Sequence, residues 1–224
     1  MQKIDYSHKY YPEWWKNTDK KTAKGAPTIK HCIAFQDFYK RGVVIPSWFD
    51  LELTIFDKNQ ERWYEWEASN HDVDTDNSHP PSQFIHFSEN NIKNMKFSSP
   101  WLCKTKEEIY WTWTQPTWSN RSFLGNCYLM PAVTNFKYQR ETHINFMIIN
   151  TDTTYSHRIH PLTPLVILHP MTEKKIKLKH HLIDEKEYES LFGIRNLLLD
   201  RDDYQDSVSR YKKSQTIINR VNDH

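Results

Sequence analysis

The sequence predicts a mainly β protein: a single barrel or jelly-roll-like domain with a helical C-terminal extension. Short segments rich in apolar and aromatic residues recur between residues 43 and 179, which is typical of successive strands. Aromatic residues make up 14% of the chain, so a core can form from few aliphatic side chains. Beyond residue 183 the apolar spacing changes to three, four or seven, which indicates helix.

Three segments follow from these patterns. Residues 1–27 form an N-terminal aromatic arm, residues 28–183 the β-rich domain and residues 184–224 the helical extension. The arm contains YYPEWWKN, with Trp14 and Trp15 side by side. Clustered large apolar side chains are rarely left in solvent. We therefore expect the arm to pack on the domain or on a neighbouring molecule.

The first part of the domain predicts a helix and a hairpin. Residues 28–42 indicate a short strand and then a short helix that ends at Gly42. In the strand that follows, Leu51, Leu53 and Ile55 alternate with polar residues and should share one face. Residues 57–60 suit a turn, and residues 62–68 suit the returning strand. Residues 71–94 are polar and irregular apart from QFIHF.

Further strands are predicted at residues 107–118, 127–138, 143–150, 165–169 and 174–179. The first of them has no polar face, so we expect it to be covered on both sides. It carries Trp111, Trp113 and Trp118, of which the first two lie on one face. These rings could stack against bases or sugars, or they could fill the core. Because aliphatic residues are few, we favour the core.

In the C-terminal extension one apolar stripe follows helical spacing. Its members are Tyr204, Val208, Tyr211, Ile218 and Val221. We expect this stripe and the aromatic arm to mediate assembly.

Composition excludes several classes of function. The four glycines are widely separated, which excludes a P-loop and a dinucleotide-binding fingerprint. The net charge of +2 makes nucleic acid an unexpected partner. No apolar run approaches the roughly 18 residues of a membrane span, and residues 1–17 lack a signal-peptide core. Three dispersed cysteines suggest a reducing, intracellular compartment.

An acidic segment matches a calcium loop only in part. Asp72, Asp74 and Asp76 stand at alternate positions, as oxygen ligands do in such loops. However, Asn77 replaces the glycine of the sharp turn and Gln83 replaces the closing glutamate. A solvated acidic loop is the favoured interpretation.

No catalytic, metal or cofactor site is predicted. Histidines gather at positions 143, 157, 160 and 169, but on an extended chain residues three apart point to opposite faces. HExxH and Cys/His metal patterns are absent, as are the GxSxG elbow and a cysteine-nucleophile signature.

Three segments carry a resemblance: TIKHCIAFQDFYKRGVVIPSWFDLELTI, SPWLCKTKEEIYWTWTQP and INFMIIN…HRIHPLTPLVILHPMTE. In this order they resemble an uncharacterised family of tailed-phage proteins that is common in marine phages. The resemblance extends from the arm to about residue 185. The later part is also similar to the trimeric dUTPase and dCTP deaminase barrel. There, a strand ending in asparagine leads to a proline-containing turn and a final apolar strand, as residues 144–150 and 159–168 do here.

The departures concern the active site. Those enzymes carry an aspartate on the hairpin before the first of these strands, and YLMPAVTNFKYQRE has none. Leu162 stands where a glycine normally follows the proline. The resemblance therefore implies the fold but not the catalytic chemistry.

The expected function is binding without catalysis. We expect a phage protein in the virion or the host cytoplasm that associates with itself and with other phage or host proteins. It would be virion-associated, or an accessory factor that engages a host target. One alternative is a nucleotide-binding or nucleotide-hydrolysing protein on a dUTPase-like barrel. Another is a carbohydrate-binding module that uses Trp111 and Trp113.

Overall fold

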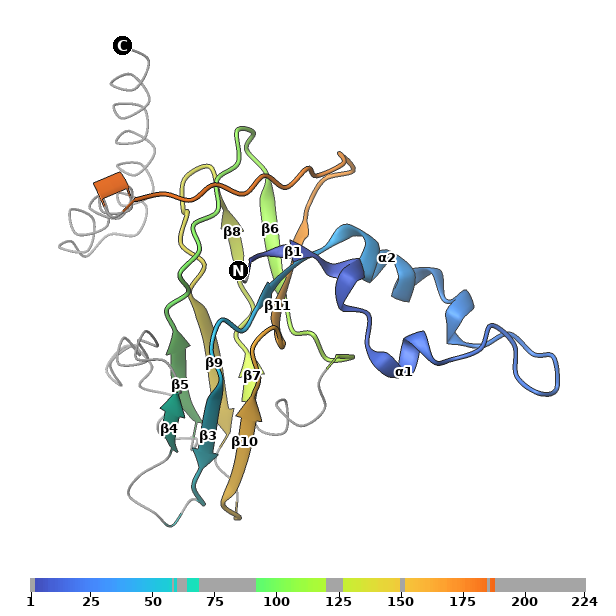
Figure 1. Ribbon diagram of the computed structural model, residues 1–224, viewed down its shortest axis with the longest axis horizontal. Helices are drawn as coiled ribbons and strands as arrows, with labels where there is room; N and C mark the ends of the chain where they lie inside the picture. Colours follow the sequence, from blue (N-terminus) through green and yellow to red (C-terminus); the bar gives the residue numbers. More distant parts are fainter. Residues whose placement is uncertain are drawn as a thin grey trace.

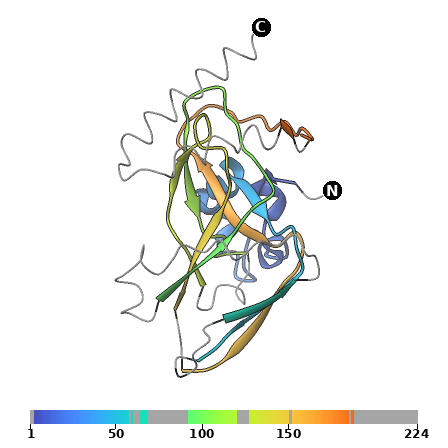
Figure 2. The same ribbon diagram turned by 90° about the vertical axis from the view of Figure 1, so that its left-hand side faces the viewer.

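The computed structural model of the chain contains three antiparallel sheets and few helices (Figures 1 and 2). It describes residues 3–57, 59, 64–68, 92–119, 127–149, 152–184, 186 and 187. The predicted mainly β class is confirmed. Among the described strands no sheet closes on itself, so the expected barrel is not present as one closed sheet.

Each sheet combines strands that are distant in the sequence. The large sheet has the order β1 (Asp5–Tyr6), β2 (Val43–Pro46), β11 (Pro164–Pro170), β6 (Tyr110–Thr114) and β8 (Val133–Asn135). The second consists of β10 (Tyr155–Ile159), β3 (Leu51–Ile55) and β4 (Tyr64–Ala68). The third consists of β5 (Ile92–Phe97), β9 (Ile144–Ile149) and β7 (Cys127–Leu129). The helices are α1 (Glu13–Lys16) and α2 (Ile33–Arg41), with 3₁₀ turns η1 (Ser7–Tyr10) and η2 (Ile29–His31).

A two-stranded ribbon passes from the large sheet into the second sheet. β2 pairs with β11, and the next strand, β3, pairs with β10. Between these pairs the Ser47 amide donates to the Thr163 carbonyl at 2.7 Å, and the Leu162 amide donates to the Ser47 carbonyl at 2.9 Å. Leu162 has φ 69°, a left-handed conformation that is uncommon outside glycine. The ribbon therefore stays hydrogen-bonded through its bend.

One hydrophobic core joins the three sheets. The predicted alternation of Leu51, Leu53 and Ile55 is confirmed, since all three side chains are fully buried. Phe49, which lies between β2 and β3, contacts Phe97 of β5 with ring centroids 5.1 Å apart. The same core cluster includes buried side chains of β6, β7, β9 and β11.

The large sheet is covered on its other face by the N-terminal region. Val44 and Ile167 are fully buried there, against Trp15, Phe35 and Tyr39 of the arm and α2. β2 and β11 are thus the strands buried on both faces, as their continuous apolar runs indicate. The prediction of two-sided burial for residues 107–118 was wrong, because β6 alternates between buried and accessible positions.

Two predicted strands are not formed, and the single strand predicted at residues 127–138 is in fact two, β7 and β8, in different sheets. Residues 28–42 contain η2 and α2 but no strand, while the helix ending beside Gly42 is confirmed. Residues 174–179 also form no strand, although Ile176 and Leu178 pack against the core as their alternation suggested. The Tyr6 hydroxyl donates to the Ile176 carbonyl at 3.3 Å and accepts from the Leu178 amide at 3.0 Å. This side chain takes the place of a neighbouring strand.

The remaining sequence predictions fall partly on residues that the structure does not describe. QFIHF and the stripe of the C-terminal extension lie outside the described residues. Within the described ranges, no helix is long and apolar enough to cross a membrane.

Glycine is required at position 42 because neighbouring side chains leave no room for a Cβ, and not because of its backbone conformation. Its φ is −87°, but a Cβ there would lie 2.6 Å from Cγ2 of Ile167 and 2.8 Å from Oγ of Ser7. Gly42→Ala should therefore lower the free energy of unfolding by about 1–3 kcal/mol, measured by urea denaturation. Gly25→Asn is the control, because Gly25 has φ 80° and open space around it, and asparagine tolerates that conformation. Equal stability of Gly42→Ala and the wild type would contradict this packing.

His169 should make stability depend on pH. Its ring packs on Phe38 of α2 with centroids 4.7 Å apart, and its buried Nε2 meets no hydrogen-bond partner among the described residues. Burial lowers the pKa of His169. As the pH falls below about 6.5, the unfolded chain takes up this proton before the folded chain does, so the folded state loses stability. His169→Gln should lose less stability than the wild type between pH 7.5 and pH 5. The free energy of unfolding of both proteins is measured by urea denaturation at each pH. If both proteins lose the same free energy between pH 7.5 and pH 5, His169 does not contribute to the pH dependence.

Candidate partner-binding site

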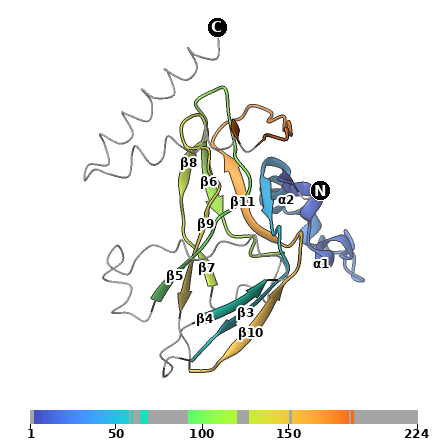
Figure 3. The same cartoon turned by 60° about the vertical axis from the view of Figure 1, so that its left-hand side comes forward.

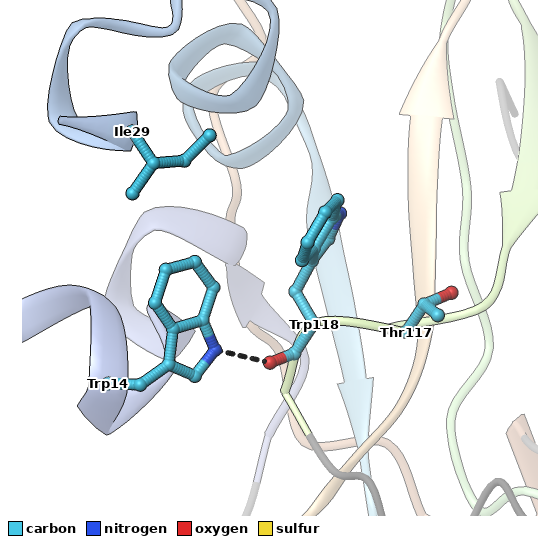
Figure 4. A pocket seen from close by; sticks show the side chains of 4 residues that line it. All are labelled: Trp14, Ile29, Thr117 and Trp118. Carbon is cyan, nitrogen blue, oxygen red and sulfur yellow. Dashed lines mark hydrogen bonds between the residues drawn. The ribbon is translucent and has the colours of Figure 1, made fainter.

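An open pocket of about 420 Å³ lies where the aromatic arm meets the turn after β6 (Figure 4). It is lined by Trp14, Ile29, Thr117 and Trp118. Trp14 belongs to α1 and Ile29 to η2, whereas Thr117 and Trp118 follow β6. The pocket thus joins two parts of the chain that are about one hundred residues apart.

The short helix α1 sends its two tryptophans in different directions. Consecutive helical residues differ by about 100° around the axis, so Trp14 and Trp15 cannot share a face. Trp15 is 7% exposed and stacks on Phe35 with centroids 4.3 Å apart, and Tyr11 stacks on its ring at 5.5 Å. Trp14 remains 36% exposed. Burial of one indole therefore fixes the other at the surface.

A hydrogen bond connects the two indole-bearing segments of the pocket. Nε1 of Trp14 donates to the backbone carbonyl of Trp118 at 3.0 Å, and Figure 4 shows this bond across the base of the pocket. The two rings are 6.1 Å apart, with planes inclined at 52°. Phe35 lies behind both and meets each ring edge-on, at 5.5 Å and 5.4 Å.

The turn that carries Trp118 is held by its own contacts. The Ser119 amide donates to the Pro116 carbonyl at 2.8 Å. The Ser119 hydroxyl and the buried Tyr39 hydroxyl form a hydrogen bond of 2.9 Å. Burial raises the pKa of Tyr39, so its hydroxyl stays protonated at neutral pH. Trp118 is 49% exposed on this fixed support.

Positive charge is concentrated in the segment of the chain that carries Trp14 and Ile29. Residues 13–31 contain five lysines and two carboxylates, a net charge of +3, whereas the whole chain has +2. Lys20, Lys21 and Lys24 are exposed on a loop that projects from the body, visible as the blue loop between α1 and α2 in Figure 1. A further lysine, Lys30, lies over the Trp15 ring at 4.9 Å.

The tryptophans named from the sequence have different positions. Trp14 lines the pocket, but Trp15 is buried in the second hydrophobic cluster. Trp111 and Trp113 are only 4% and 8% exposed, and Trp113 Nε1 donates to the Thr134 hydroxyl at 2.9 Å. These two rings fill the core and present no stacking surface.

Other named residues do not join this site. Tyr204, Val208, Tyr211 and Ile218 lie outside the described residues. Ile29 and Thr117 were not singled out from the sequence, because neither belongs to a local pattern that indicates binding. Their place in the pocket follows from tertiary structure alone.

Reactive groups in the described part of the chain are dispersed or buried. No group of three or more His, Cys, Asp or Glu residues is placed to hold a metal ion in these ranges. Burial raises the pKa of Cys103 and of Cys127 to about 12, so neither thiol forms a thiolate nucleophile near neutral pH. The acidic segment with Asp72, Asp74 and Asp76 lies outside the described residues.

Comparisons with protein-family models, curated proteins and solved structures found no match to this chain.

The hydrogen bond of Trp14 should contribute to stability. Trp14→Phe and Trp118→Phe remove similar ring area from partly exposed positions, but only the first removes the donor to the Trp118 carbonyl. Trp14→Phe should therefore lower the free energy of unfolding by about 0.5–1.5 kcal/mol more than Trp118→Phe does, measured by urea denaturation. Equal effects would mean that the hydrogen bond adds nothing measurable.

Proposed function

We propose that the chain is a non-enzymatic binding protein of a tailed phage and that the pocket of Trp14, Ile29, Thr117 and Trp118 is its partner-binding site. The observation that carries this proposal is the pair of exposed indoles fixed by the hydrogen bond between Trp14 and Trp118. Tryptophan is enriched among residues that dominate binding energy. Rings already held in place lose little freedom when a partner binds.

The phage assignment rests on the sequence resemblance. The three resembling segments include η2, α2, β2, β3, β6 and β11. Of these, η2 supplies Ile29 to the pocket, α2 supplies Phe35 behind both indoles, and β6 leads into the turn with Thr117 and Trp118. The protein would act in the virion or in the host cytoplasm, with phage proteins, host proteins or further copies of itself as partners.

At the level of fold, the proposal includes a jelly-roll-like body of the dUTPase type. Two features support it: one core shared by three sheets, and a ribbon that passes from one sheet to another. Leu162 also has a left-handed φ at the position where the dUTPase-type barrels carry glycine. This likeness supports the fold alone, because the catalytic aspartate of those enzymes has no counterpart in the sequence.

Removing both indoles should weaken partner binding strongly. Trp14→Ser with Trp118→Ser should reduce the amount of this protein recovered with purified particles, or with its complex from infected cells, at least tenfold. Quantitative mass spectrometry gives the readout. Ile33→Ser is the matched control, since Ile33 is apolar and 73% exposed on α2 but does not line the pocket.

The same experiment separates the two forms of the proposal. Recovery in stoichiometric amount with particles makes the protein virion-associated, and recovery only from infected cells makes it an accessory factor. Recovery of the double variant at the wild-type level, with its fold intact by circular dichroism, would contradict the assignment of the binding site.

A further inference from the structure

We propose that the pocket receives residues 72–81 of a second copy of the chain, so that copies associate head to tail. This inference rests on the proposed function and names the partner of the same site. The segment reads DVDTDNSHPP and combines three aspartates with Pro80–Pro81, the only adjacent pair of prolines in the sequence.

The shape of the pocket favours proline over a flat ring. A planar base is held between two aromatic rings when these are parallel, but the planes of Trp14 and Trp118 are inclined at 52°. Their inclined faces and the Ile29 side chain make a crease with apolar walls. A proline ring is compact, apolar and non-planar, and extended proline-rich segments dock in aromatic-lined grooves.

Trp118 carries a hydrogen-bond donor on the side of its ring that faces away from the crease. In the described ranges no acceptor meets Nε1 of Trp118, and Figure 4 shows this nitrogen turned away from Trp14. Proline has no amide N–H but keeps its carbonyl acceptor. A free indole N–H beside an aromatic crease therefore matches an extended proline segment, whose carbonyls point outward.

Charge favours the same occupant. The pocket adjoins residues 13–31 with their net charge of +3, and the lysines at 20, 21 and 24 are exposed. Residues 72–81 contain Asp72, Asp74 and Asp76 and no lysine or arginine. An extended chain rises about 3 Å per residue, so the aspartates would lie roughly 12–25 Å from the prolines. The three carboxylates complement the net charge of +3 on residues 13–31.

The arrangement of the sheets favours a second copy over the same one. The described residues that flank the segment are Ala68, at the end of β4, and Ile92, at the start of β5. Figures 1 and 3 show β4 and β5 on the side of the molecule away from α1. Each copy would thus give its segment to one neighbour and receive a segment from another. Such heterologous contacts build rings or filaments.

The test is sedimentation velocity of the full chain with two complementary variants. The pocket variant carries Trp14→Ser and Trp118→Ser, and the segment variant carries Pro80→Ala, Pro81→Ala and Asp→Asn at positions 72, 74 and 76. We expect the wild type to associate and each variant alone to associate at least tenfold more weakly. Mixed together, the variants should form a one-to-one dimer and nothing larger, since one intact pocket meets one intact segment.

A charge-matched control removes three carboxylates elsewhere. Asp200, Asp202 and Asp203 changed to Asn alter the net charge as the segment variant does, and this protein should associate like the wild type. A monomeric wild type, or variants that associate as it does, would overturn the inference. So would a mixture that gives no dimer.

Particle binding distinguishes this inference from the proposed function. If the segment variant binds particles or the infected-cell complex normally while the pocket variant does not, the proposed function stands and the second copy is not the partner.

Indole fluorescence tests an alternative class of ligand, single-stranded nucleic acid. If a single-stranded oligothymidylate, and not a peptide of residues 71–83, shifts the emission of Trp118, the pocket takes nucleic acid and the inference falls.

Discussion

The pairing of β2 with β11 places apolar side chains on both faces of the large sheet. Other parts of the fold must therefore cover each face. One face is covered by the core that the three sheets share. The other face, with Val44 and Ile167, is covered by α2 and the aromatic arm, which contribute Trp15, Phe35 and Tyr39. Burying aromatic side chains of this size removes much apolar surface from water, so this N-terminal layer is a structural part of the domain.

The proposed binding site lies at the edge of that layer. Because Trp15 is fixed in the interior of the layer, the adjacent Trp14 is presented at its rim, where the turn after β6 supplies Trp118. Phe35 supports both rings from below. The proposed binding site therefore depends on the same aromatic packing that covers the sheet, and variants that loosen this packing should affect stability and binding together.

In some segments, sequence patterns correctly predicted which side chains are buried, because the spacing of apolar residues reports directly on which face of a segment meets the core. Alternation located the buried face of β3, and the apolar run at residues 165–168 marked β11. Alternation at Ile176 and Leu178 correctly indicated packing on the core, but a strand needs a neighbouring backbone, and there a tyrosine hydroxyl provides the hydrogen bonds. The pocket could not be predicted, because Trp14 and Trp118 are distant in sequence and only tertiary structure brings them together.

The bent ribbon has a consequence for biosynthesis. Val44 pairs with Ile167, so β2 leaves the ribosome 123 residues before its partner. At roughly 5–20 residues per second, this delay is on the order of 6–25 s. In that interval an apolar strand would be open to aggregation, but β1, α1 and α2 have already been synthesised. The aromatic arm is available to cover one face of β2 from the start, so its rings would shield Val44 from water until β11 has been synthesised.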